Sequence, residues 1–340
     1  MFLVGFCVLA AVLHLLVPSP LDLHADMRSE KLLLLDEWHG KATAAAFGSS
    51  HVNNSFDPRV FDATLAGTPD AETSINLAVS GGAQTEQRRL ALRFVHQLTP
   101  AAGETPLVLL ELSAGANLTN DHLVHPRAIN LYDEGTLRFA WGLGRGLGHG
   151  HLSRNQSLGR RGYALAAWGL YAANMGMISS RIFSAPMDAE RVEQENEDDR
   201  RGLEVTPQSA KQRDEVLKTV STMQWKQGTQ AGTLVAANRL LAEELQATSA
   251  VPGLQVAYIV PPKLEDVAGV TTWPACINTG KGAVPILNVA LPSLYPELYR
   301  DRANWLDEAH VSEKGAAIVT KALAAAWLQW KQHPSTACEG

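Results

Sequence analysis

Five short apolar runs alternate along this chain with longer segments of helical spacing, and this alternation limits the folds open to it. The runs end at glycine, proline or polar residues and cover 42–47, 74–79, 106–113, 254–260 and 284–289. None of them alternates strictly between apolar and polar residues, which is typical of parallel strands covered on both faces. Helical spacing follows at 84–97, 231–247 and 314–330. The order predicts a three-layer α/β/α sandwich with a central five-stranded parallel sheet.

A long helical insertion separates the third and fourth predicted strands, at about 120–230. This is far more chain than a simple crossover between parallel strands needs. Within it, 138–161 is rich in glycine and arginine and predicts a loop, whereas 161–183 is apolar enough for a helix lying over the core. An acidic run at 187–201 predicts a solvated segment, and 219–246 returns to helix. We expect the insertion to cap one side of the sheet and to help shape a substrate cleft.

The composition favours a globular protein and argues against nucleic acid as a partner. Of the 340 residues, 46% are hydrophobic and 19% are charged, which is ordinary for a folded domain. The formal net charge is -6, so the chain lacks the basic surface that nucleic-acid binding requires.

The first 20 residues predict a signal anchor or a signal peptide. Met1 to Val17 carries no charged side chain, and Pro18-Ser19-Pro20 ends the apolar stretch. A basic start and an evident cleavage site are both missing, so we favour an uncleaved anchor with residues 30–335 outside the cytoplasm. A buried first strand or helix is the alternative. Cys276 and Cys338 could pair in an oxidising compartment, and two inert thiols fit the sequence equally well.

Two distant segments together predict a nucleophilic serine with its base. Phe47-Gly48-Ser49-Ser50-His51 forms a small-residue turn after the first predicted strand, and Asp307-Glu308-Ala309-His310 follows the last one. A serine hydroxyl needs a positioned base, and that base works best when a third group orients it. We therefore predict Ser50, His310 and Asp307 as a catalytic triad.

The Asp-x-x-His pattern occurs twice, and position in the fold separates the two copies. Asp36-Glu37-Trp38-His39 precedes the first predicted strand. His310 instead follows the last strand, and ligands of open α/β sheets gather at the carboxyl ends of the strands. His39 is accordingly predicted to be structural.

Two further segments offer candidate oxyanion donors. Gly81 and Gly82 come where the second predicted strand ends, and a glycine there lets a backbone N–H approach a developing oxyanion. Asn117 follows the third strand, where its amide could donate to the same oxygen. A plain strand-to-helix turn is the alternative for the glycines. A turn or cap is the alternative for Asn117, and Asn120 competes for its role.

Ser50, Gly81, Asn117 and His310, in that order at successive strand ends, resemble the marker residues of the SGNH (GDSL-like) hydrolase superfamily. The resemblance covers about residues 43–328 without the insertion. Ser49 stands where that family has an aspartate, a variant similar to the membrane-anchored branch that includes teichoic acid D-alanylation and alginate O-acetylation proteins. The segment 305–316 is similar to the carboxyl-terminal block of that branch. The oxyanion hole is then expected to use the N–H groups of Ser50 and Gly81 and the Asn117 amide.

The resemblance implies an exported serine esterase or O-acyltransferase, acting through an acyl-enzyme on ester-linked acyl groups of cell-envelope or extracellular polysaccharide. The acyl group expected is acetyl. The expected location is the cell envelope, either membrane-anchored or secreted, with a possible membrane partner in acyl transfer. The alternative is an inactive scaffold or carbohydrate-binding protein with the same fold.

No cofactor or metal is expected. His149-Gly150-His151 and His122 with His125 offer imidazoles, but no cysteine or carboxylate cluster completes a ligand set at useful spacing. His51 either lines the cleft or caps a turn, and Asp57-Pro58 predicts a loop.

Overall fold

The structure is a computed structural model that describes most of the chain outside the amino-terminal segment and parts of the insertion. The described residues are 27–82, 84–99, 105–112, 132–143, 154–172, 200–205, 229–231, 236–267, 269–335 and 338, with isolated positions 5, 8, 12, 211, 214 and 218. The segment predicted as an anchor thus lies almost entirely outside them. Among the helices that are described, none has the length and apolar character needed to cross a membrane.

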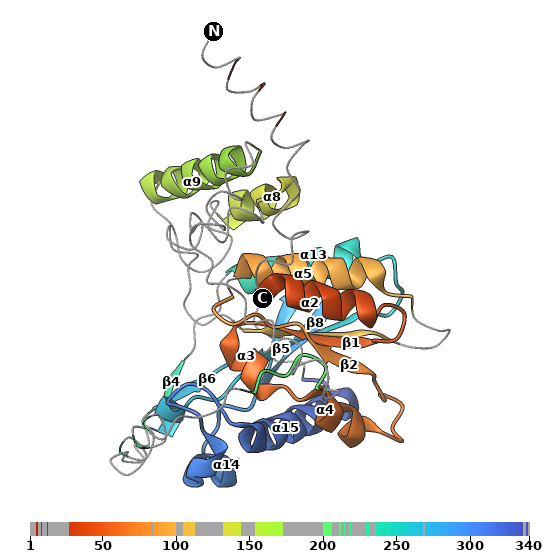
Figure 1. The fold of residues 1–340 in the computed structure, drawn as a ribbon, viewed down its shortest axis with the longest axis vertical. Coiled ribbons are helices and arrows are strands. Elements are labelled where there is room, and N and C mark those ends of the chain that lie inside the picture. The colour runs from red at the N-terminus through yellow and green to blue at the C-terminus, as the bar shows by residue number, and fades with distance from the viewer. Residues whose placement is uncertain are drawn as a thin grey trace.

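A mixed six-stranded sheet forms the centre of this α/β fold (Figure 1). Its strand order is β2-β1-β3-β5-β8-β7. The strands are β1 (Ala44–Phe47), β2 (Ser74–Asn76), β3 (Leu107–Glu111), β5 (Gln255–Val260), β7 (Cys276–Thr279) and β8 (Gly282–Asn288). All neighbours except β7 and β8 pair in parallel. The carboxyl ends of β1, β2, β3, β5 and β8 therefore meet at one edge of the sheet.

The prediction of five strands is wrong in number, because β7 adds a sixth. It pairs antiparallel with β8, with Cys276 opposite Pro285 and Thr279 opposite Gly282. The four residues of β7 are flanked by turns and supply only two buried side chains, Cys276 and Ile277. So short an apolar stretch resembles a loop in the sequence, which is why this edge strand was not predicted.

Helices cover both faces of the sheet (Figure 1). On one face lie α2 (Met27–Glu37), α5 (Gln84–Gln97) and α13 (Ala236–Thr248); on the other lie α3 (Ser50–Ser55), α4 (Pro58–Leu65) and α15 (Glu313–Gln332). Each face has its own apolar core. All four residues of β1 are completely buried, and three of them are alanines, which let helices approach this central strand closely.

Local sequence explains why α4 begins where the sequence analysis expected a loop. The Asp57 side chain accepts a hydrogen bond from the Arg59 N–H at 3.0 Å and caps the helix. Pro58 occupies the first turn, where its missing N–H costs nothing. Asp57-Pro58 is thus a helix start, and the loop prediction is wrong at this point.

The described part of the insertion contains helices where a loop was expected. The second half of α8 (Glu134–Leu143) and the start of α9 (Arg154–Ala172) fall within the predicted loop 138–161. The strand β4 (Thr229–Ala231) interrupts the helix predicted over 219–246. The strand β4 pairs in parallel with β6 (Val270–Thr272) in a separate two-stranded sheet. Helix α9 packs against α8 and buries Ala164 and Ala167 in the core on that side of the sheet, as predicted, but it leaves Leu158 and Leu165 about half exposed, at 56% and 50%.

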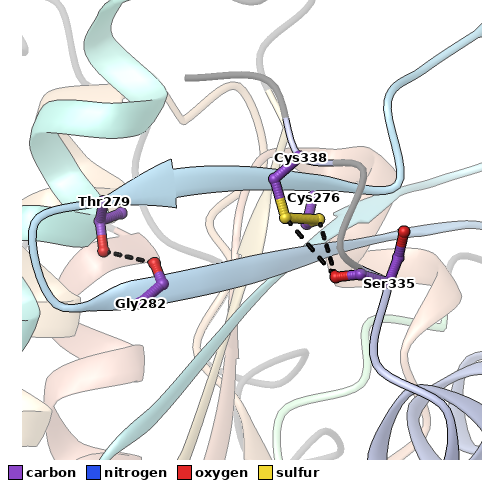
Figure 2. Close-up of a disulfide and its surroundings, with 5 residues drawn as sticks. All are labelled: Cys276, Thr279, Gly282, Ser335 and Cys338. Carbon is purple, nitrogen blue, oxygen red and sulfur yellow. Dashed lines mark hydrogen bonds between the residues drawn. A yellow bond between two sulfur atoms is a disulfide. The ribbon is translucent and has the colours of Figure 1, made fainter.

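A disulfide between Cys276 and Cys338 ties the end of the chain to the edge of the sheet (Figure 2). Cys276 opens β7, and Cys338 follows the last helix, α15. Both sulfur atoms lie near the backbone oxygen of Ser335, at 3.7 and 3.8 Å. Of the two alternatives left open by the sequence, paired cysteines and inert thiols, the structure has the pair.

Candidate active site

The turn from β1 into α3 presents Ser50 at the carboxyl end of a central strand. Ser49 caps α3, because its Oγ accepts a hydrogen bond from the His51 N–H at 3.3 Å. Ser50 is the first residue of that helix, so its N–H lies in the first turn, where no helical carbonyl can accept it. Gly48 precedes the cap, and a Cβ there would come within 2.5 Å of the Glu111 carboxylate and 2.6 Å of Val52. A tight, glycine-dependent turn therefore sets the position of Ser50.

A short closed loop carries His310 to the same edge of the sheet. Trp305 and Val311 form an antiparallel bridge across its base, and the Leu306 N–H donates to the His310 carbonyl at 2.8 Å. The Trp305 side chain is fully buried and its indole N–H donates to the Leu298 carbonyl at 2.9 Å. After the loop, Ser312 caps α15 through the Gly315 N–H. Both ends of the loop are thus fixed by buried structure.

Ser50, His310 and Asp307 form one hydrogen-bonded chain. The His310 Nε2 lies 2.8 Å from the Ser50 Oγ, although 260 positions separate the two residues in the sequence. The other ring nitrogen, Nδ1, lies 2.9 Å from each carboxylate oxygen of Asp307. If Nδ1 carries the proton and donates it to Asp307, the lone pair of Nε2 faces the serine hydroxyl. In this arrangement the imidazole can take the proton of Ser50.

The environment keeps the Asp307 carboxylate ionised. Partial burial raises its pKa, but the hydrogen bonds from the His310 ring and from the N–H groups of Ala309 and His310 outweigh burial and lower the pKa below its usual value. Both N–H groups donate to Asp307 Oδ1 at 2.8 Å. A carboxylate held in this way is suited to orient an imidazole and to stabilise its cation.

The turn after β2 packs against the turn that carries Ser50. The Val79 N–H donates to the Gly48 carbonyl at 3.0 Å, and Gly81 adopts a left-handed conformation with φ of 67° that favours glycine. The Gly82 N–H is already used, because it donates to the Val79 carbonyl at 2.6 Å. Within the described part of the chain, no hydrogen bond uses the N–H of Gly81 or of Ser50. Of the two glycines, Gly81 is thus the better oxyanion donor. Asn117 lies outside the described residues.

A buried polar network behind α3 was missed in the sequence. Asn53 donates to the Glu204 carboxylate at 2.6 Å and to the Ser80 hydroxyl at 3.2 Å, and Lys31 donates to the Asn53 side-chain oxygen at 2.9 Å. Ser80 also donates to Glu204. These contacts join α3, which begins at Ser50, to the residue before Gly81. No spacing pattern could reveal them, because Glu204 is 151 positions from Asn53 and lies within the insertion.

Glu111 and His51 are two more polar residues at the site that the sequence analysis left unassigned. Glu111 ends β3, and its carboxylate accepts hydrogen bonds from Ser49. The His51 ring stacks on the His310 ring with a centroid distance of 5.2 Å and an interplanar angle of 14°. The sequence contained one indication that Glu111 belongs to the site. This residue lies at the end of a predicted strand, at the same sheet edge where we predicted His310.

The second Asp-x-x-His copy lies away from this site. His39 is exposed in the turn between α2 and β1, before the amino end of that strand. Asp36 accepts hydrogen bonds from Arg93 and Gln97 on α5, at 3.3 and 3.1 Å. It therefore supports helix packing and forms no triad with His39.

Metal-ligand geometry does not occur among the described residues, in which no group of three or more histidine, cysteine, aspartate or glutamate side chains could hold an ion. His122, His125, His149 and His151 lie outside the described residues. A comparison of the chain with protein-family models, with curated proteins and with solved structures gave no match.

Proposed function

We propose that this protein is an exported serine esterase or O-acyltransferase that acts on ester-linked acyl groups, with acetyl the preferred group, of cell-envelope or extracellular polysaccharide. The observation that carries the proposal is the hydrogen-bonded chain from Ser50 Oγ to His310 and on to Asp307. Such a chain supplies a nucleophile, a base and an orienting carboxylate, which acyl transfer through a covalent intermediate requires.

In the first half-reaction, Ser50 Oγ attacks the acyl carbon while its proton passes to His310 Nε2. The tetrahedral oxyanion is held by the N–H groups of Ser50 and Gly81, with the Asn117 amide as the proposed third donor. Each such donor can contribute about 10²–10³ in rate. The ester bond then breaks, and the leaving alcohol takes the proton from His310. The acyl group remains bound to Ser50.

In the second half-reaction, water or a sugar hydroxyl gives its proton to His310 and attacks the acyl-enzyme. Ser50 regains its proton as the acyl–serine bond breaks. Water as acceptor makes the protein an esterase, and a sugar hydroxyl makes it an acyltransferase. The ring of His310 is partly exposed, with 25% of its side chain accessible, so an acceptor can reach it.

The finer fold assignment belongs to the same proposal. We assign residues 30–335 to a three-layer α/β/α sandwich of flavodoxin-like order, similar to the SGNH hydrolases, with an insertion at about 120–230. The five parallel strands and the helices on both faces support this assignment, and β7 is an addition to it.

Export is supported by the Cys276–Cys338 disulfide, since disulfides persist in oxidising compartments and are rare in reducing ones. The proposed location is therefore the cell envelope, with residues 1–20 as an anchor or a signal peptide. A membrane protein that supplies the acyl group is a possible partner of such an enzyme.

Labelling with a fluorophosphonate probe tests the proposal directly. We expect the wild-type protein to react and Ser50→Ala to stay unlabelled, because the probe reports an activated serine. A folded wild-type protein that does not react would contradict the proposal and favour an inactive scaffold or carbohydrate-binding protein. Hydrolase and transferase are then separated with p-nitrophenyl acetate: adding oligosaccharide acceptors should accelerate nitrophenol release and give acetylated sugar only if the protein is a transferase.

A further inference from the structure

A second carboxylate, that of Glu111, lies directly beneath the turn that carries the nucleophile. The Ser49 N–H donates to Glu111 Oε2 at 2.5 Å, and the Ser49 hydroxyl donates to Oε1 at 3.1 Å. Both oxygens of one carboxylate thus bind the residue next to Ser50. Gly48 permits this approach, since a Cβ at that position would lie 2.5 Å from Oε2. The turn is built around the carboxylate.

The same contacts orient the His51 ring. The Ser49 Oγ lies 3.0 Å from His51 Nδ1, and Glu111 Oε1 lies 3.5 Å from that nitrogen. A hydroxyl has one proton, so when the Ser49 hydroxyl donates to Glu111, its oxygen can only accept from His51. In that arrangement the proton of the His51 ring is on Nδ1. Glu111 and Ser49 together hold the ring in one orientation.

His51 links this carboxylate to the catalytic base. Its ring lies nearly parallel to the ring of His310, at the 5.2 Å centroid distance given above. The side chains of Glu111 and His51 are mostly buried, with 17% and 22% exposed, so both are constrained by packing as well as by hydrogen bonds. His310 is therefore held by Asp307 at Nδ1 and by a fixed aromatic ring against one face.

We propose that Glu111 is a positioning residue for the nucleophile and its base, acting through Ser49 and His51. The proposal rests on the function proposed above. Glu111 touches none of the reacting atoms; it holds the turn that places Ser50 Oγ and the ring that packs on His310. The SGNH-like pattern has an aspartate at position 49, and here a carboxylate from β3 reaches the same turn.

The test compares Glu111→Gln and Glu111→Ala with the full-length wild type. A small misplacement of reacting groups can cost about 10²-fold in rate, so we expect kcat for p-nitrophenyl acetate and the rate of fluorophosphonate labelling to fall by about 10–100-fold. KM should change by less than about 3-fold, because substrate contacts are left in place. The matched control is Glu265→Gln, whose carboxylate is 74% exposed, and it should match the wild type.

A spectroscopic readout distinguishes positioning from a general loss of stability. In protein labelled with ¹⁵N-histidine, the wild-type His51 should give the signature of an Nδ1–H ring. Glu111→Gln should shift that signal toward a mixture of tautomers while thermal unfolding remains cooperative. This isosteric variant carries the test if Glu111→Ala fails to fold.

Moving the carboxylate from position 111 to position 49 should restore activity. Ser49→Asp in the Glu111→Gln background places an acceptor where Ser49 Oγ contacts the His51 N–H and Nδ1, and aspartate also caps a helix well. We expect at least about tenfold recovery of kcat relative to Glu111→Gln alone.

The proposal is overturned if Glu111→Gln keeps the wild-type kcat, labelling rate and His51 spectrum while His310→Ala is inactive. A wild-type protein that never reacts with the probe would instead count against the proposed function. The histidine spectrum would still report whether Glu111 holds His51, so the two failures can be told apart.

Discussion

Ser50 and His310 meet only because the chain returns to the same edge of the sheet after 260 positions. If His310 is the base, no other described residue can replace it, because no other side chain among the described residues lies within hydrogen-bonding distance of Ser50 Oγ. We predict that His310→Ala lowers kcat for p-nitrophenyl acetate by at least about 10³-fold and abolishes probe labelling, as loss of a triad base does in serine hydrolases.

His39 provides the matched control for that prediction. It has the same Asp-x-x-His context, but it is exposed and Asp36 contacts α5 instead. His39→Ala should keep kcat within about twofold of the wild type. Equal loss of activity in both variants would contradict the assignment of His310 as the base.

At the residue scale, the meeting of Ser50, His310 and Asp307 could be predicted because chemistry and topology both restrict it. A small-residue turn after the first strand and a histidine after the last one must share an edge if the strands are parallel. Glu111 and Glu204 could not be predicted in the same way. Their partners, Ser49 and Asn53, are 62 and 151 positions distant, and a lone glutamate near a strand end is common. Only the folded structure shows that these two carboxylates are partly buried against their partners.

At the scale of elements, the start of α15 is held so closely against the segment before the His310 loop that only glycine fits at position 315. A Cβ there would lie 2.2 Å from the Asn304 carbonyl oxygen and 2.9 Å from Val311. Glycine to alanine in a helix normally gains about 1 kcal/mol, but overpacking against backbone costs about 1–3 kcal/mol or more.

The cost of the clash therefore exceeds the gain in helix propensity, and we predict that Gly315→Ala lowers the free energy of unfolding by about 1–2 kcal/mol. The variant should also have a lower kcat, because the His310 loop must shift. Denaturant unfolding and ester hydrolysis measure the two effects. Gly162→Ala on α9 is the control: its Cβ would meet nothing within 4 Å, so this variant should gain stability. A stabilised Gly315→Ala protein would contradict the packing argument.

The 3-10 helix η2 (Leu264–Val267), which contacts the loop that carries His310, contains a carboxyl group with a perturbed pKa. Burial is the main cause that raises the pKa of Asp266 to about 6, although hydrogen bonds from the Lys263 N–H and the Tyr299 hydroxyl oppose it. The neighbouring Leu264 N–H donates to the Glu308 carbonyl at 2.9 Å. A change in the charge of Asp266 is therefore expected to affect how firmly the segment between Asp307 and His310 is held.

Because the folded pKa lies above the unfolded value near 3.9, the contribution of Asp266 to stability is full below about pH 4 and is lost as pH rises through about 6. We predict that Asp266→Asn reduces the change in the free energy of unfolding between pH 4 and pH 7 by roughly 1–2 kcal/mol. Compared with the wild type, this variant should therefore gain stability at pH 7 relative to pH 4. Urea unfolding at pH 4, 5, 6 and 7 measures the difference. A difference between the two proteins that stays constant across this range would contradict the raised pKa.

At the scale of the whole molecule, the sequence was informative where burial is strong and local. The parallel strands could be predicted, because strands covered on both faces are continuous apolar runs. The short edge strand β7 could not, since it has only two buried side chains and is too short to show a periodic pattern. Nor could the arrangement of α9, because apolar residues such as Leu158 and Leu165 on its exposed face obscure the side on which Ala164 and Ala167 are buried.

The disulfide acts on the whole molecule, because it closes the chain between the sheet edge and the end of the described residues. Cys276 and Cys338 are 62 positions apart, and the chain-entropy model gives about 4 kcal/mol for a loop of that length. Measured values are often smaller, so we predict that Cys276→Ala combined with Cys338→Ala lowers the free energy of unfolding by about 2–4 kcal/mol. The wild type with reductant should unfold like the double variant in guanidinium. Probe labelling of Ser50 should persist in the folded variant, since neither cysteine contacts the triad. A wild type whose unfolding is unaffected by reductant would show that the bond does not form in solution, and would remove the support that it gives to export.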